Sequence, residues 1–304
     1  MSEPRSYYGR PVIKAPVWTP EIPIYFFVGG MAGASATLAW LADETGNERL
    51  ARSAWAVALA GGSVSPPLLI SDLGRPSRFL NMLRMFKVTS PMSVGSWILM
   101  AAGSSIAPSA VNALTGRFAR LARFTRPAAA AMGLPLATYT GALIANTAVP
   151  VWHEARRELP FLFAAGGAAS AGAASVILTP VNHAGPARRL AIGACAAELA
   201  IVTLMERRLG ELGEPYQQGD AGRYGRVAKA LTALGGLTIA AAARRSRPAG
   251  IAGGLSILGG AMAERWSVYR AGFQSAADPK YTVGPQRARV EAGGGHGATR
   301  RVPA

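Results

Sequence analysis

Charged residues are scarce in this chain of 304 residues. Only 16% of them are charged, whereas half are hydrophobic, and the mean hydropathy is +0.21. Several stretches of about 18 residues or more carry no charge, and a helix of that length can cross a hydrocarbon core about 30 Å thick. A soluble core does not need so many such stretches, so the composition indicates a membrane protein.

Cysteine and histidine are almost absent. The single Cys195 excludes an intrachain disulfide and a cysteine-rich metal or iron-sulfur site in this chain. The three histidines are His153, His183 and His296, and none lies in the interior of an apolar run. A cytochrome b type subunit needs axial ligands inside its helices, so we predict no haem, no iron-sulfur cluster and no other bound metal.

Acidic residues are half as numerous as basic ones, which gives a net charge of +16. In a soluble protein this excess would suggest nucleic acid. Here the arginines lie mostly between apolar runs and in the tails, where basic residues face lipid headgroups. The sequence therefore predicts contact with membrane lipid and no nucleic-acid partner.

The apolar runs divide the chain into three parts. We predict an extramembrane segment at residues 1–20, a membrane domain at 21–270 and a polar, basic tail without fixed structure at 271–304. The fold class predicted for the membrane domain is all-α and integral to the membrane, with eight transmembrane helices. The predicted spans are 22–41, 51–71, 94–114, 127–150, 160–180, 190–205, 227–243 and 249–262.

The polar start of the chain is unlike a cleavable signal peptide, so the first span is expected to direct insertion. Glycine and alanine crowd the spans, as in "VGGMAGASA", which favours close helix packing in lipid. Eight spans put both termini on one side. More lysine and arginine residues lie on that side, although the excess comes from the tails. The positive-inside rule then makes it cytoplasmic in a multi-pass protein of the cell inner (plasma) membrane.

Polar side chains gather at the span ends that meet on the terminal side. They are Glu21, Tyr25, Asp72, Tyr139, Asn146 and His153. Such a cluster can hold a polar head group whose apolar tail lies in lipid, and a quinone fits that description. Two simpler interpretations stay open: interfacial aromatic and basic residues serve as membrane anchors, and Asp72 pairs with Arg75 or Arg78.

Glu198 lies near the middle of the sixth span, in "LAIGACAAELAIVTLME". A carboxylate at that depth costs about 2.5 to 3.5 kcal/mol on insertion scales. Glu198 is therefore a candidate for proton transfer, and the alternative is a neutral glutamic acid that bonds to a neighbouring helix.

Three segments resemble the NrfD-like family, the membrane subunits related to polysulfide reductase. They are "WTPEIPIYFFVGGMAGASA", "DLGRPSRFLNMLRMFKVTSPMSVGSW" and "YTGALIANTAVPVWHEARRELPFLFAAGGAASAG". The similarity runs in order through residues 7–206, and the middle segment is its most specific part. The last three spans add only hydropathy.

The resemblance implies eight helices in two four-helix bundles without haem. It also implies a menaquinone or ubiquinone site near the face where a four-cluster ferredoxin-like iron-sulfur subunit docks. That partner would connect the quinone to a molybdopterin enzyme containing molybdenum or tungsten. Family members are proposed to exchange two electrons and two protons with quinone, and some are thought to move protons through the bundle.

The resemblance implies roles for two residues. Tyr139 matches the quinone-contacting tyrosine of the family, and Asp72 matches the acidic position that closes the second helix. In some family members, polar residues at the start of the first helix contact quinone. These positions align only loosely with 20–23 in this chain, where we assign the contact to Glu21. His153 and Glu198 come from the residues themselves and not from the family.

The leading hypothesis is a quinone-reactive subunit of an oxidoreductase complex that is not catalytic alone. Its catalytic residues would be Asp72, Tyr139 and Glu198, with Asp72, His153 or Glu198 relaying protons and arginines as counter-charges of Asp72. One alternative is a purely structural anchor for the catalytic subunits. The other is a small-solute or ion permease, although the halves of the chain show no similarity to each other.

Overall fold

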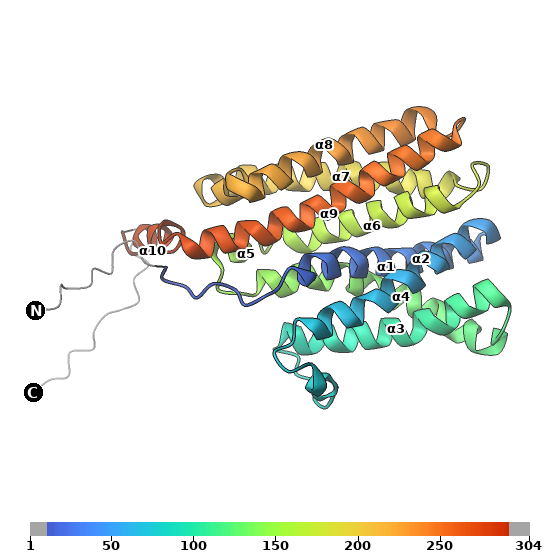
Figure 1. The fold of residues 1–304 in the computed structure, drawn as a ribbon, viewed down its shortest axis with the longest axis horizontal. Coiled ribbons are helices and arrows are strands. Elements are labelled where there is room, and N and C mark those ends of the chain that lie inside the picture. Colours follow the sequence, from blue (N-terminus) through green and yellow to red (C-terminus); the bar gives the residue numbers. More distant parts are fainter. Residues whose placement is uncertain (1–10, 292–304) are drawn as a thin grey trace, which may run out of the picture.

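The computed structural model describes residues 11–291, and within that range the chain is helical and contains no strand (Figure 1). The predicted segments at 1–20 and 271–304 therefore lie partly outside the described residues, as does His296. The elements are α1 (Glu21–Glu44), α2 (Glu48–Ser71), η1 (Pro76–Leu83), α3 (Pro91–Thr115), α4 (Ala119–Ala145), α5 (Pro150–Glu154), α6 (Leu159–Leu178), α7 (Gly185–Leu209), η2 (Gly210–Tyr216), α8 (Gly219–Ala242), α9 (Arg247–Ala277) and α10 (Lys280–Glu291).

Five of these helices are long and apolar enough to cross a membrane, namely α1, α2, α3, α4 and α6. The helices α7, α8 and α9 are 24 to 31 residues long, but charged residues interrupt their apolar stretches. In lipid a helix satisfies its backbone hydrogen bonds internally, which explains why the apolar runs fold in this way. That all eight long helices span the membrane stays a prediction.

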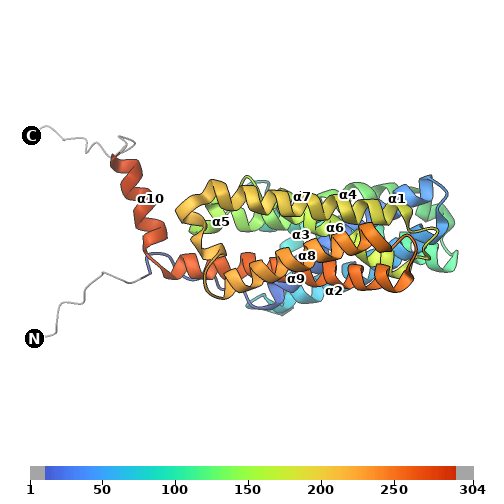
Figure 2. The same ribbon diagram turned by 90° about the horizontal axis from the view of Figure 1, so that it is seen from above.

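The long helices run side by side, and consecutive ones are antiparallel (Figure 1). Helices α1 to α4 pack mainly on one another, as do α6 to α9, and α1 and α4 contact α6 between the two groups. The starts of α1, α3, α6 and α8 and the ends of α2, α4, α7 and α9 lie at one end of the molecule. We call this end, with η1, α5, η2 and α10, the terminal face. Helix α10 lies across it (Figure 2).

Glycines let the helices approach closely within the first group and between the two groups. A Cβ on Gly33 of α1 would overlap the carbonyl oxygen of Gly133 on α4 and lie 3.1 Å from Cβ of Leu136. A Cβ on Gly167 of α6 would lie 2.9 Å from the carbonyl oxygen of Gly30. Small residues at such contacts permit backbone packing in lipid, where no hydrophobic force drives helices together.

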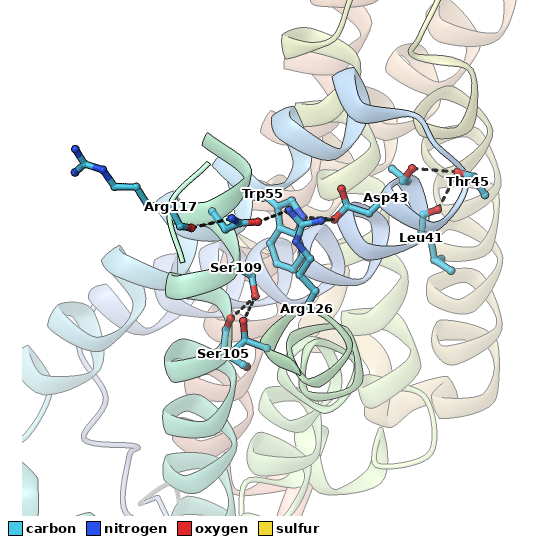
Figure 3. A network of polar contacts seen from close by, with 11 residues as sticks. Leu41, Asp43, Thr45, Trp55, Ser105, Ser109, Arg117 and Arg126 are labelled. Carbon is cyan, nitrogen blue, oxygen red and sulfur yellow. Dashed lines mark hydrogen bonds and ion pairs between the residues drawn. The ribbon is translucent and has the colours of Figure 1, made fainter. Parts of the chain in front are cut away.

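A polar network joins the four helices of the first group at the end opposite the terminal face (Figure 3). Oδ2 of Asp43 accepts a hydrogen bond of 2.8 Å from Nε1 of Trp55 and pairs with Arg126 at 3.1 Å. Arg126 also donates to Oδ1 of Asn112 at 2.8 Å. These residues belong to α1, α2, α4 and α3, so the network fixes how that end of the group is assembled.

The structure corrects two predicted span ends and the prediction for the tail. The fourth span ends at Ala145 and not at residue 150, and α5 follows as a separate turn. The eighth, predicted to end at residue 262, continues as α9 to Ala277 because its second half is buried. The prediction that the tail lacks fixed structure is wrong for 271–291. Just before this stretch, Nε1 of Trp152 donates to the carbonyl of Val268 at 2.7 Å and helps to hold the extended α9.

Helix α10 is attached to η2 through Glu214. The carboxylate accepts hydrogen bonds from Nζ of Lys280 and, at 3.1 Å, from the hydroxyl of Tyr281. These bonds, that from Lys280 above all, hold the pKa of Glu214 below its ordinary value. The start of the tail is thus tied to the terminal face.

Replacement of Gly33 by alanine tests the packing of α1 on α4. The added Cβ overlaps the backbone of Gly133, so we expect a loss of about 1 to 3 kcal/mol in stability. The measurement is the thermal unfolding midpoint of the purified chain in detergent. Gly193→Ala is the matched control, since no atom lies within 4 Å of a Cβ there. Equal midpoints for the two variants would contradict this packing.

Candidate functional site

Asp72 ties the end of α2 to the segment that precedes α1. Its Oδ1 accepts two hydrogen bonds from Thr19, at 2.8 Å from the backbone nitrogen and 2.9 Å from the hydroxyl. None of the ion pairs among the described residues involves Asp72. The expected pairing with arginine is therefore wrong: Arg75 and Arg78 are exposed, because the chain turns outward into η1 directly after Asp72.

Glu21 and Tyr25 lie on the first turns of α1, directly after Thr19. Tyr25 is fully buried, and its hydroxyl has no hydrogen-bond partner among the described residues. Oε2 of Glu21 is likewise buried without a partner. Buried polar atoms of this kind are rare in folded proteins and mark places where a water or ligand can bind.

Tyr139 of α4 lies against α3, where Gly95 makes room for its ring. A Cβ on Gly95 would overlap the ring and lie 2.8 Å from Cδ2. The side chain is half-buried. Ser90 caps the start of α3 and accepts a hydrogen bond from the nitrogen of Ser93, and Pro91 occupies its first turn. The segment "TSPMSVG" thus starts α3 and places the glycine under Tyr139.

An apolar groove of about 230 Å³ lies between α2, η1 and α3. It is lined mainly by aliphatic, methionine and phenylalanine side chains, among them Leu69, Ile70, Phe79, Leu83, Leu99 and Met100. Ile70 is two residues from Asp72, and Ser96, also in the lining, follows Gly95. The groove therefore adjoins both the end of α2 that carries Asp72 and the part of α3 that seats Tyr139.

Two other predicted residues are exposed on the terminal face. Asn146 follows the last residue of α4, and His153 belongs to the short α5. Their neighbour Trp152 is not the interfacial anchor that its position suggested. It is buried, and its ring stacks on that of Trp18 with centroids 5.3 Å apart. The terminal face therefore brings the predicted residues to one end of the molecule, but not into one enclosed pocket.

Glu198 lies in the other helix group, away from the groove. It is 3% exposed on α7 and is accompanied by two residues of α9, Glu264 at 5% and Arg265 at 2% exposed. Arg265 donates from Nη1 to Oε2 of Glu264 and from Nη2 to the carbonyl of Phe163 at 3.0 Å. Its guanidinium lies 3.8 Å from the centroid of the Phe163 ring. We call Glu198, Glu264 and Arg265 the buried charge cluster.

The sequence prediction missed Glu264, Arg265 and Gly95. The first two follow Met262, where the eighth span was ended, although small and apolar residues continue beyond them in "AERWSVYRAG". Gly95 lies in the most specific predicted segment, but a glycine in a helix does not reveal which side chain it receives. The sequence after Met262 could therefore have indicated the cluster, whereas nothing in the sequence indicates that Gly95 receives the ring of Tyr139.

No three histidine, cysteine, aspartate or glutamate side chains within 11–291 gather closely enough to hold a metal ion. The groove, the terminal face and the buried charge cluster are thus the polar and apolar features that any function must use.

These features define an α-helical membrane protein with a polar face at one end of its helices. The family model described as polysulphide reductase, NrfD, matches residues 12–205. The chain belongs to this family, which comprises membrane subunits of polysulfide reductase-type complexes. No curated protein matches the chain. The match includes α1 to α6 and most of α7, but not the residues of α9 in the buried charge cluster.

A double-mutant cycle tests the seat of Tyr139. Gly95→Ala is expected to destabilise the chain, because the new Cβ overlaps the tyrosine ring. In a Tyr139→Ala background the same change should cost much less, since the ring is gone. The coupling energy between the two sites, from thermal unfolding in detergent, should lie within about 0.5 to 3 kcal/mol. Additive effects would show that the ring lies elsewhere.

Proposed function

We propose that this chain is the quinone-binding membrane subunit of a multisubunit molybdopterin and iron-sulfur oxidoreductase. In this proposal all eight long helices cross the inner membrane as two four-helix bundles, α1 to α4 and α6 to α9. The quinone is menaquinone or ubiquinone, and its site lies at the terminal face. The observation that carries the proposal is the apolar groove, whose lining includes Ile70, two residues from Asp72, and Ser96, next to the glycine that seats Tyr139.

The residues around the groove fit a quinone. The lining is suited to an isoprenoid tail, because it offers aliphatic and aromatic surface. A quinone head group needs hydrogen-bond donors for its carbonyl oxygens, and the half-buried Tyr139 hydroxyl is such a donor. The buried hydroxyl of Tyr25, which has no partner in the described chain, is a second donor nearby on α1.

A bound quinone would supply the capacity to exchange two electrons and two protons. Tyr139 would orient the head group by donating its O–H to a carbonyl oxygen. Asp72 would accept a proton at its carboxylate, whose Oδ1 is held by Thr19 and whose other oxygen stays available. His153, exposed on α5, would pass that proton between the site and water, and Asn146 would line the polar entrance.

The electrons must come from or go to a partner, because the sequence offers a single cysteine and no helix-interior histidine for a resident centre. We propose that a four-cluster ferredoxin-like subunit docks on the terminal face and connects to a molybdopterin subunit with molybdenum or tungsten. Exposed Arg75, Arg78, Arg84 and Lys87 around η1 offer this partner a basic surface. The same face is proposed to be cytoplasmic, from the distribution of basic residues.

Tyr139→Phe removes the proposed hydrogen bond and keeps the ring on Gly95. We expect quinone-linked turnover of the purified complex to fall about tenfold, which corresponds to about 1.4 kcal/mol, the value of one hydrogen bond. Subunit assembly should be unchanged. Tyr224→Phe on α8 is the matched control, because it removes a hydroxyl far from the groove. Unchanged turnover in Tyr139→Phe would remove this residue from the proposal.

Asp72→Asn separates proton exchange from structure. Asparagine still offers an oxygen to Thr19, so the end of α2 should stay in place, but it cannot take up a proton. We expect turnover with quinone to drop and its pH dependence to change, while the quinone that co-purifies in lipid extracts stays bound. Full turnover would leave Asp72 a structural residue. A purified wild-type complex that contains no quinone would favour a purely structural anchor. Solute uptake by the chain alone would favour a permease.

A further inference from the structure

The buried charge cluster holds more negative than positive charge. Two carboxyl groups, Glu198 and Glu264, share the single guanidinium of Arg265, and all three are at most 5% exposed. Removing an uncompensated charge from water costs several kcal/mol, and a buried group avoids this cost by becoming neutral. One of the two carboxyl groups must therefore carry a proton.

The contacts of Arg265 identify which carboxyl that is. Arg265 donates to Glu264, so Glu264 is the ionised partner. A Cβ on Gly166 would lie 2.8 Å from Nη2 of Arg265 and 3.4 Å from Oε1 of Glu198, so both side chains lie over this glycine of α6. Oε2 of Glu198 and Oε1 of Glu264 are both buried without a partner among the described residues, but only Glu264 receives a hydrogen bond from Arg265. The neutral acid is Glu198.

A cavity of about 20 Å³ connects the cluster with the terminal face, and it is large enough for one water molecule. Glu198 and Glu264 line its inner part. Glu206 and Lys229 also line it, and Nζ of Lys229 donates to both carboxylate oxygens of Glu206, at 2.7 and 2.6 Å. The Lys229 side chain is 38% exposed, so this pair lies at the surface of the helix group.

Polar groups surround the cluster only toward the terminal face. Those that face the cluster or its cavity, from every element packed there, are Glu198, Glu206 and Cys195 of α7, Lys229 and Thr232 of α8, Glu264, Arg265 and Ser267 of α9, Tyr216 of η2 and the carbonyl of Phe163 of α6. Toward the opposite ends of α6 to α9 the sequence has no carboxyl, imidazole or amine before Arg189, Arg244 and Arg247.

We infer that the buried charge cluster is a proton-binding site that exchanges with the terminal face through Glu206 and Lys229. Glu198 releases its proton across the water-sized cavity to the Glu206–Lys229 pair and from there to water. A proton that returns by the same route binds the ionised carboxylate of Glu198, and no electron moves with it. The second helix group thus holds a proton on the side where the quinone site opens. The inference rests on the proposed function only for the source and use of that proton.

Infrared spectroscopy of the purified full chain in nanodiscs tests this inference without quinone. The wild type at neutral pH should show a carboxylic-acid C=O band that Glu198→Gln removes. Glu264→Gln should remove the same band, because Glu198 then ionises as the sole partner of Arg265. Glu211→Gln, at an exposed acid of η2, is the matched control and should leave the band intact. A band that survives in Glu198→Gln, or its absence from the wild type, would show that the two carboxyl groups share no proton and would overturn the inference.

The route is tested by transfer of the same samples into deuterated buffer. Glu206→Gln and Lys229→Met should keep the acid band but slow its isotope shift severalfold relative to the wild type and Glu211→Gln. An unchanged exchange rate in both variants would show that the proton enters by another path. A negative result in either infrared experiment would not contradict the proposed quinone site, because that site is tested separately by the turnover of Tyr139→Phe in the complex.

Discussion

A bulky side chain lies against the bare backbone of a glycine on a neighbouring helix at three places in this chain. Gly95 receives the ring of Tyr139, Gly166 receives the guanidinium of Arg265, and Gly272 receives the indole of Trp152. In lipid, helices associate through such close packing and not through burial of apolar surface from water. The positions of the functional side chains therefore depend on glycines that carry no chemistry themselves.

The two polar regions lie in different helix groups and are joined by aromatic rings. Phe163 contacts Arg265 through its ring and its carbonyl, and its ring centroid lies 5.5 Å from that of Phe26 on α1. Phe26 is next to Tyr25, whose ring centroid is 6.0 Å away. Direct contacts thus run from the start of α1 to the buried charge cluster, although the two regions share no residue.

Much of the fold could be predicted from the sequence, because uncharged runs of sufficient length allow few structures in a membrane. The burial of Glu198 followed from its place within such a run. The companions of Glu198 did not, since a span was assumed to end where charge returns, whereas Glu264 and Arg265 neutralise each other and stay inside. The partner of Asp72 was predicted wrongly for a related reason. Nearness in sequence favoured Arg75 and Arg78, but η1 turns them to the surface and the start of α1 supplies Thr19.

We propose that quinone binds between α2, η1 and α3 at the terminal face. The most direct test is photolabelling of the purified complex with an azido-quinone, followed by mass spectrometry of the labelled peptides. We expect label within residues 66–103, and excess unlabelled quinone should prevent it. Label confined to other helices, or label in this range that competing quinone does not reduce, would contradict it.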